Sequence, residues 1–357
     1  MAKGNSIFLP MAVNKKKKVR AGAKKISLAL QGGGTHAAFT WGCLDRFLED
    51  DAVEIEGISG VSAGAMNAAL LVYGVNADSK QEARKLLESF WRKVSTLASM
   101  SPFQPTIMDR MFGNKDFTFS PSFYALDYLT RLFSPYQFNF FDLNPMRDLL
   151  GELLDFSELR KGKKIDLFIN ASNVKTGKPR VFKKKELDME MLMASGCLPF
   201  LSKSVEVDGE FYWDGGYSGN PALRPLIKET DTSDIVIIQV NPLNNEDVPL
   251  KAQEILNRVN EISFNNSLLR EVGCISLISE LIAAGKLKSS LYRQINLHMI
   301  EAEDIMTGFG PASKFNADWD FLIHLKETGR QAADDWLENN YEKIGEKSSL
   351  DVEGLLK

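Results

Sequence analysis

Residues 26–71 read ISLALQGGGTHAAFTWGCLDRFLEDDAVEIEGISGVSAGAMNAALL, and this stretch decides the fold class. The short apolar run at 26–31 is typical of a buried strand, and a helix-compatible segment follows the glycines, from about residue 36 to 49. A second apolar run at 53–58 leads into small apolar residues from 65 onward, which suit a helix packed closely on a sheet. Strand, helix, strand and helix in this order predict an α/β fold whose parallel sheet is covered by helices.

The rest of the chain adds an insert, a hairpin, further strands and long helices. Residues 80–155 are predicted to be a helical insert, rich in aromatic residues and interrupted by prolines. Its aromatic residues favour either a second core or a lid for an apolar ligand, and a large exposed apolar patch would indicate the lid. Strands are predicted at 165–171, 180–182, 235–240 and 295–300, a hairpin around Asp208-Gly209, and helices at 250–287 and 318–340.

These patterns divide the chain into three regions. We expect a basic disordered tail over residues 1–25, a catalytic domain over 26–228 that contains the insert, and a helix-rich C-terminal region over 229–357 packed on the sheet.

Composition excludes several classes of protein. The hydrophobic content of 44% and the charged content of 25% are ordinary for a globular protein and exclude fibres and wholesale disorder. The three cysteines, Cys43, Cys197 and Cys274, predict neither a disulfide framework nor a zinc site. We therefore expect no metal and no cofactor. No apolar run approaches the ~18 residues of a membrane span, and no secretory signal is present, so the expected location is the cytoplasm, with peripheral membrane contact left open.

Charge is distributed unevenly along the sequence. The chain has 43 basic and 47 acidic side chains, but residues 1–25 carry eight basic side chains and no acidic one. The remainder therefore has 35 basic against 47 acidic side chains, and this excess of negative charge excludes a nucleic-acid partner. The basic tail suits contact with an anionic membrane surface, and a solvated tail is the alternative.

The pentapeptide Gly60-Val61-Ser62-Ala63-Gly64 fits the G-x-S-x-G nucleophile elbow. In that motif a serine lies on a sharp turn from a strand to a helix, and the flanking glycines relieve crowding. The predicted strand before Ser62 and the predicted helix after it supply the required context. Ser62 is therefore the candidate nucleophile, with Gly60 and Gly64 as the glycines of the elbow.

The glycines after the first strand form the second candidate element. Gly32, Gly33, Gly34 and Thr35 allow backbone N–H groups to converge at the start of a helix, where the potential is positive. The segment lacks the lysine of a Walker loop, and Ala37 and Ala38 stand where a dinucleotide-binding loop needs a final glycine. With a serine nucleophile about thirty residues later, these residues are predicted to bind substrate and stabilise an oxyanion.

A base for Ser62 has two candidate sources. Asp214 ends a predicted strand, and Gly215 and Gly216 allow the chain to turn sharply and bring the carboxylate close to another loop. The alternative is a late histidine, His298 or His324, as in the triad order of α/β-hydrolases, but that fold places more strands before its elbow. We favour Asp214. Asn220-Pro221, a few residues later, resembles a helix N-cap followed by proline at the first helical position.

The order of these motifs resembles the patatin-like phospholipase family. The resemblance rests on the glycine segment, the serine elbow, Asp214-Gly215-Gly216 and Gly219-Asn220-Pro221-Ala222, and it covers residues 26–228. It implies a three-layer α/β/α sheet and hydrolysis of lipid acyl esters by a dyad of Ser62 and Asp214, without a catalytic histidine or calcium. His36 stands where many family members have arginine, and Ala37 where they have glycine.

The expected function is thus that of a serine carboxylic ester hydrolase acting on lipid acyl esters, with phospholipid as the expected class. Two alternatives remain at this point: a non-catalytic protein on the same fold that binds lipid or a partner, and a histidine-dependent α/β-hydrolase with esterase or thioesterase activity. The sequence leaves oligomerisation open.

Overall fold

The computed structural model of the protein describes residues 22–77, 79–101, 106, 109, 117, 120–139, 142–245, 248–250, 252–288 and 292–357. Residues 1–21 of the predicted basic tail and part of the predicted insert therefore lie outside the described residues.

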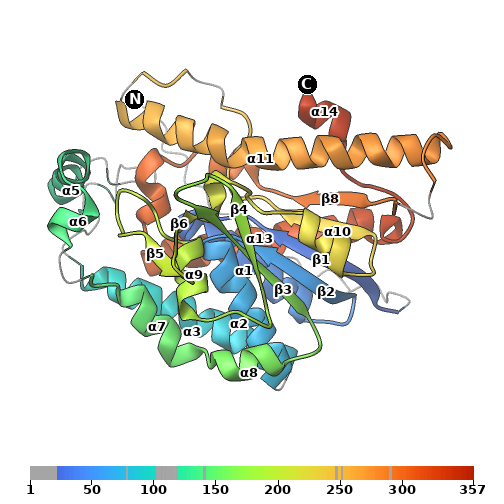
Figure 1. The fold of residues 1–357 in the computed structure, drawn as a ribbon, viewed down its shortest axis with the longest axis horizontal. Coiled ribbons are helices and arrows are strands. Elements are labelled where there is room, and N and C mark those ends of the chain that lie inside the picture. The colour runs from blue at the N-terminus through green and yellow to red at the C-terminus, as the bar shows by residue number, and fades with distance from the viewer. Residues whose placement is uncertain are drawn as a thin grey trace, which may run out of the picture.

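A mixed sheet of eight strands forms the centre of the described structure (Figure 1). Its order is β5-β6-β3-β2-β1-β7-β8, and β4 also pairs with β3. The strands are β1 (Lys24–Leu30), β2 (Val53–Gly60), β3 (Asp166–Asn173), β4 (Pro179–Lys183), β5 (Val205–Val207), β6 (Glu210–Asp214), β7 (Asp234–Ile238) and β8 (Asn296–Ile300). Strands β3, β2, β1, β7 and β8 run parallel, whereas β4, β5 and β6 join by antiparallel pairing.

Helices cover both faces of this sheet. The α-helices are α1 (Ala38–Leu48), α2 (Ala63–Ala77), α3 (Lys80–Ser99), α5 (Pro121–Leu132), α6 (Pro135–Phe138), α7 (Pro145–Leu153), α8 (Phe156–Lys161), α9 (Met189–Ser195), α10 (Arg224–Glu229), α11 (Ala252–Ala283), α12 (Glu303–Met306), α13 (Trp319–Asn340) and α14 (Val352–Leu356). The part of the chain that the structure describes also has four 3₁₀ helices, η1 (Gly34–Ala37), η2 (Gly215–Tyr217), η3 (Pro311–Phe315) and η4 (Tyr341–Lys343).

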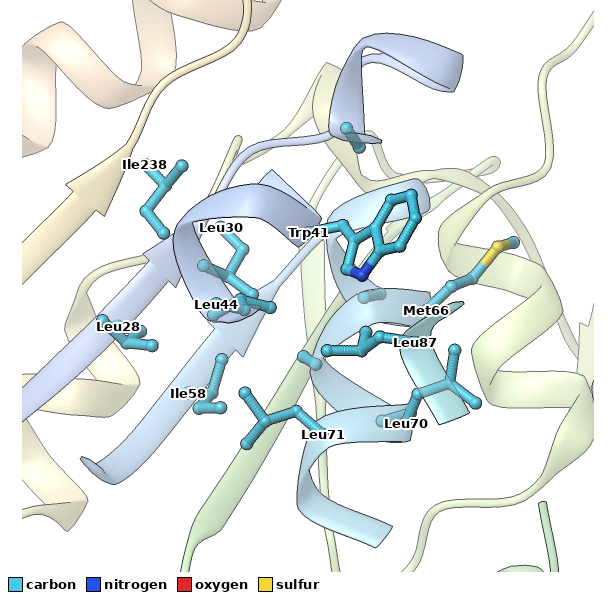
Figure 2. Packing of buried hydrophobic residues seen from close by; sticks show 14 of the residues in the cluster. Leu28, Leu30, Trp41, Leu44, Ile58, Met66, Leu70, Leu71, Leu87 and Ile238 are labelled. Atoms are coloured by element: carbon cyan, nitrogen blue, oxygen red, sulfur yellow. The ribbon is translucent and has the colours of Figure 1, made fainter. Parts of the chain in front are cut away.

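Alternation along β1 assigns the two faces. Leu28 and Leu30 are fully buried against α1, α2, α3 and α13, and Figure 2 shows Leu28 and Leu30 with Trp41 and Leu44 of α1. Ala29, between them, belongs to a second core with residues of α10 and α11. This two-sided burial gives three layers, helix–sheet–helix, and confirms the predicted α/β fold class.

The C-terminal region belongs to both outer layers and to the sheet. Strands β7 and β8 extend the sheet beyond β1, α11 crosses one face, and α13 packs against α1 on the other. Within the described residues, no helix is both long enough and apolar enough to cross a membrane.

Helices α1 and α13 approach so closely that glycine is required at their crossing. A Cβ atom on Gly42 would lie 1.9 Å from the backbone oxygen of Lys326, and one on Gly329 would lie 2.0 Å from that of Phe39. At this crossing the two helices therefore contact each other directly through their backbones.

Gly42→Ala is therefore expected to lower the free energy of unfolding by about 3 kcal/mol, because the helices must separate to admit one methyl group. Chemical denaturation measures this change. Gly151→Ala in α7 is the matched control, since its Cβ would meet its nearest neighbour at an ordinary 3.6 Å. Equal stability of both variants would contradict the close crossing.

Candidate active site

The strand register brings Ser62 and Asp214 to the same level of the sheet. Gly60, the last residue of β2, pairs with Ile169 of β3, whereas Asp214, the last residue of β6, pairs with Ala171. Asp214 therefore lies two residues beyond the end of β2, level with Ser62. Strand β1 ends beside Gly60, so Gly32 reaches this level as well.

Ser62 occupies the sharp turn that the elbow motif predicts. Strand β2 ends at Gly60, α2 begins at Ala63, and Ser62 has a φ of 55°, in the left-handed region that residues other than glycine seldom adopt. The two flanking glycines are needed for packing. A Cβ on Gly60 would lie 2.8 Å from the oxygen of Gly64, and one on Gly64 would lie 2.5 Å from the oxygen of Gln31. Backbone strain of this kind occurs preferentially at functional sites.

The glycine-rich segment lies directly against this serine. A Cβ on Gly32 would be 2.8 Å from the Cβ of Ser62, and one on Gly33 would be 2.6 Å from a methyl group of Val240. Gly34 has a φ of 60° and passes the backbone oxygen of Lys314, where a Cβ would lie only 2.5 Å away. All three glycines are thus required by close contacts, and the contact of Gly32 is with Ser62 itself.

Thr35 and His36 attach the glycine segment to η3 of the C-terminal region. The Thr35 hydroxyl donates a hydrogen bond of 3.0 Å to the backbone oxygen of Ser313. The ring nitrogen Nε2 of His36 lies 2.8 Å from the Ser313 hydroxyl. Burial, together with the positive charge of Lys314, lowers the pKa of His36 to about 3, so the ring is neutral at physiological pH.

Asp214 is buried, with 1% of its surface exposed. Its Oδ1 accepts a hydrogen bond of 2.8 Å from the N–H of Gly216. A Cβ on Gly215 would lie 2.1 Å from the oxygen of Asn170, and one on Gly216 would lie 2.9 Å from the ring of Phe264 in α11. These contacts explain why two glycines follow the aspartate.

The other oxygen of Asp214, Oδ2, is buried and has no hydrogen-bond partner of normal geometry among the described residues. Burial raises the pKa of Asp214 from 3.8 to about 6, while the Gly216 N–H and the Ser62 hydroxyl act in the opposite direction. The Ser62 hydroxyl thus favours the charged form of Asp214, although it makes no hydrogen bond of normal geometry with Oδ2. A buried carboxylate with an elevated pKa beside a serine is suited to accept the serine proton.

Two buried polar residues that the sequence analysis did not select, Ser195 and Asn170, connect the serine elbow to the aspartate loop. The N–H of Ser62 donates a hydrogen bond of 2.9 Å to the Ser195 hydroxyl, which donates one of 2.7 Å to the oxygen of Asn170. The side chain of Asn170 donates to the oxygens of Gly215 and Gly219, at 3.0 and 2.8 Å. No local motif marks these residues, because their roles depend on partners far away in the sequence.

Asn220 corrects the N-cap prediction. Helix α10 begins at Arg224, and its N-cap is Leu223, so Asn220 caps no helix. Instead its Oδ1 accepts the N–H of Gly32 at 2.8 Å. The Gly32 N–H is thereby engaged, and the N–H groups of Gly33, Gly34 and Thr35 remain as candidate donors to an oxyanion.

Three further buried amides hold the end of β1, where the glycine segment begins. The Gln31 side chain accepts the N–H groups of Val240 and Asn241, at 3.0 and 3.1 Å, and donates to the Asn265 side chain at 3.2 Å. The Asn241 amide donates 2.6 Å to the oxygen of Gly32. Asn241 and Asn265 belong to the C-terminal region, so this region fixes the geometry of the glycine segment.

The two histidines proposed for a triad lie elsewhere. His298 is fully buried in β8, where its ring nitrogens contact Asp234 at 3.0 Å and Ser349 at 2.8 Å. Asp234 begins β7, so this cluster lies at the amino ends of the parallel strands, opposite the edge that carries Ser62. His324 lies on α13, with its ring 6.3 Å from that of Phe309. The structure brings neither histidine to Ser62.

These features define a class: an α/β protein with a serine on a strand-to-helix turn, a buried aspartate level with it and a glycine-rich segment against it. The model of the patatin-like phospholipase family matches residues 28–227, more than half of the chain. The chain therefore belongs to the patatin-like phospholipase family, as the sequence motifs predicted.

Solved structures similar to this chain include two bacterial proteins. VipD from Legionella pneumophila is 17% identical over 89% of this chain and 67% of its own, with a TM-score of 0.40. ExoU of the type III secretion system of Pseudomonas aeruginosa, in complex with SpcU, is 15% identical over 90% of this chain, with a TM-score of 0.36. The match spans 54% of ExoU, about half of that protein. A comparison with curated proteins gives no match.

Proposed function

We propose that this protein is a serine acyl hydrolase that cleaves carboxylic esters of lipids, with phospholipid as the expected substrate class. Membership of the patatin-like phospholipase family supports lipid hydrolysis. The observation that carries the finer proposal is the buried Asp214, whose pKa is raised to about 6, level with a serine held at positive φ.

In the proposed first step the Ser62 hydroxyl attacks the ester carbonyl carbon while its proton passes to Oδ2 of Asp214, the oxygen that has no hydrogen-bond partner among the described residues. The N–H groups of Gly33, Gly34 and Thr35 stabilise the oxyanion, and each such donor contributes roughly 3 to 4 kcal/mol in comparable enzymes. The ester C–O bond then breaks, Asp214 gives the proton to the departing alcohol, and the acyl group remains bound to Ser62.

In the second step a water molecule attacks the acyl-enzyme. Asp214 accepts a proton from this water, the bond between the carbonyl carbon and Oγ of Ser62 breaks, and the proton returns to Ser62. The fatty acid leaves, and both residues recover their starting state. One carboxylate serves both steps because its raised pKa makes it a stronger base than an exposed aspartate.

The experiment that tests this proposal is labelling with a fluorophosphonate. We expect Oγ of Ser62 to attack phosphorus and expel fluoride, and peptide mass spectrometry to locate the adduct on Ser62. Ser62→Ala is the control that should remain unlabelled. Release of fatty acid from phospholipid vesicles and from a short soluble ester tests turnover.

A folded wild-type protein that neither labels nor hydrolyses an ester would contradict the proposal. The non-catalytic alternative would then stand, since it requires only binding of lipid or a partner. Full activity of a His298→Ala, His324→Ala double variant is the expected result that separates the dyad from the histidine-dependent alternative.

A further inference from the structure

The predicted aromatic-rich insert divides into two parts in the structure. Phe90 and Trp91 of α3 and Leu150 of α7 are buried in the core, as a packing role predicts. Helices α5 and α6 instead carry exposed large apolar side chains, and they stand at one end of the molecule, at the left in Figure 1. These exposed residues are Tyr128, Leu129, Leu132, Phe133, Tyr136, Phe138 and the nearby Leu143.

Large exposed apolar patches mark interaction sites on soluble proteins, and these seven exposed apolar side chains come from one short segment of the chain. Leu132 is 56% exposed and Leu143 is 73% exposed. We name the seven exposed apolar residues between positions 128 and 143, together with Phe200, the α5–α6 face.

One loop connects the α5–α6 face to the candidate active site. At one end, a Cβ on Gly196 would lie 3.6 Å from Oγ of Ser62, and the oxygen of Cys197 accepts the N–H of Asp214 at 2.8 Å. At the other end, Ser204 contacts the Tyr136 hydroxyl of α6 through its own hydroxyl, at 2.7 Å, and through its N–H, at 3.2 Å. Phe200 lies between these ends in the sequence and is 69% exposed.

The chemistry of the face favours a lipid surface over a charged partner. From 128 to 143 the sequence contains only two charged residues, Arg131 and Asp142, of opposite sign. Leucine and phenylalanine, together with tyrosines that combine an apolar ring with a polar hydroxyl, are suited to the boundary between headgroups and acyl chains. A protein bound to this face would cover the loop beside Ser62 and so block access of the substrate. A lipid surface would instead contain the ester that Ser62 is proposed to cleave.

We propose that the α5–α6 face docks on a lipid bilayer by inserting its apolar side chains, and so presents a bilayer ester to Ser62. This inference rests on the proposed function for its substrate. The docking itself depends on apolar burial rather than on attraction to anionic headgroups, so it extends to uncharged bilayers and persists at high salt.

The test uses the full chain and vesicles of phosphatidylcholine, which carry no net charge and so give the basic tail little electrostatic attraction. The variant is Leu132→Ser with Phe133→Ser. Both residues are exposed, and neither takes part in the proposed chemical steps. We expect co-sedimentation with vesicles and hydrolysis of vesicle phospholipid to fall about tenfold or more, since two inserted side chains are lost. Hydrolysis of a short soluble ester is expected to remain within about twofold of wild type, because binding of this substrate needs no bilayer.

A matched control is available on α11. Leu277 and Ile278 are 56% and 36% exposed, but they lie in the half of the helix near the amino ends of the parallel strands, since Ser279 contacts Ile295 just before β8. Leu277→Ser with Ile278→Ser should leave vesicle binding unchanged. Ser62→Ala should bind vesicles like wild type, which separates docking from catalysis.

Vesicle binding by Leu132→Ser, Phe133→Ser equal to that of wild type would overturn the proposal. Sedimentation velocity supplies a second readout: a wild-type dimer that becomes monomeric in this variant would assign the face to a second copy of the chain and overturn lipid docking. If wild type hydrolyses no ester but its vesicle binding still depends on Leu132 and Phe133, the proposed function fails and the docking surface stands.

Discussion

Ser62→Ala is expected to lower ester hydrolysis by at least about 10⁴-fold while leaving the fold intact, because the covalent step needs an oxygen that alanine does not have. The change removes one partly buried oxygen atom at the elbow. The backbone N–H of residue 62 keeps its hydrogen bond to Ser195. Stopped or continuous assay of a soluble ester measures the loss, and circular dichroism checks the fold.

Ser195 is the informative control for this prediction. Its hydroxyl lies 2.9 Å from the N–H of Ser62 and donates to Asn170. Ser195→Ala removes both hydrogen bonds but keeps the nucleophile, so we expect a loss of only about tenfold, from poorer positioning of the elbow. A larger loss in Ser195→Ala than in Ser62→Ala would show that Ser62 is not the nucleophile.

The sequence predicted the elements whose signals are local. The elbow is recognisable because Gly60, Ser62 and Gly64 are close together and follow an apolar strand. The structure explains why Gly60 and Gly64 are glycines, because a Cβ on either residue would collide with a neighbouring backbone oxygen. The fold class was predictable for the same reason, because β1, α1, β2 and α2 follow one another along the chain without an insert.

The parts that the sequence did not predict depend on contacts between distant segments. Asn241 and Asn265 lie 209 or more residues after Gly32 and Gln31, yet they hold the start of the glycine segment. An asparagine after a strand or within a long helix gives no signal of such a role. The proline after Asn220 predicts a helix cap, whereas the side chain of Asn220 accepts the N–H of Gly32.

The position of His298 was equally inaccessible to sequence analysis. A late histidine fits the triad order of one hydrolase fold, and the sequence alone left this option open. The choice between Asp214 and His298 as the base depends on which end of β8 approaches Ser62. Parallel pairing with β7 sets His298 opposite Val236, and its ring contacts Asp234 at the start of β7, away from the edge that carries the serine.

Asp214→Asn is expected to lower turnover about 10³- to 10⁴-fold, because the amide has the shape of the carboxylate but cannot accept the Ser62 proton. The wild-type rate should also depend on pH. Since the pKa of Asp214 is raised to about 6, kcat/KM for a soluble ester should decline below pH 6 as the carboxylate becomes protonated. The residual activity of Asp214→Asn should lack this acid limb. An unchanged acid limb in the variant would assign the base to another group.

Ionisation of Asp214, which activity requires, is expected to lower the stability of the fold. The folded state raises the pKa of Asp214 from 3.8 to about 6, so the unfolded chain releases this proton more readily. Ionisation of Asp214 therefore costs stability as pH rises from about 4 to 6, and the cost is on the order of 3 kcal/mol above pH 6. Asp214→Asn does not titrate, so its free energy of unfolding relative to wild type should rise over this range and then level off. Denaturation at pH 4 and pH 7.5 measures the difference, and a variant that is inactive yet more stable at pH 7.5 would show that the buried carboxylate is kept for chemistry rather than for folding.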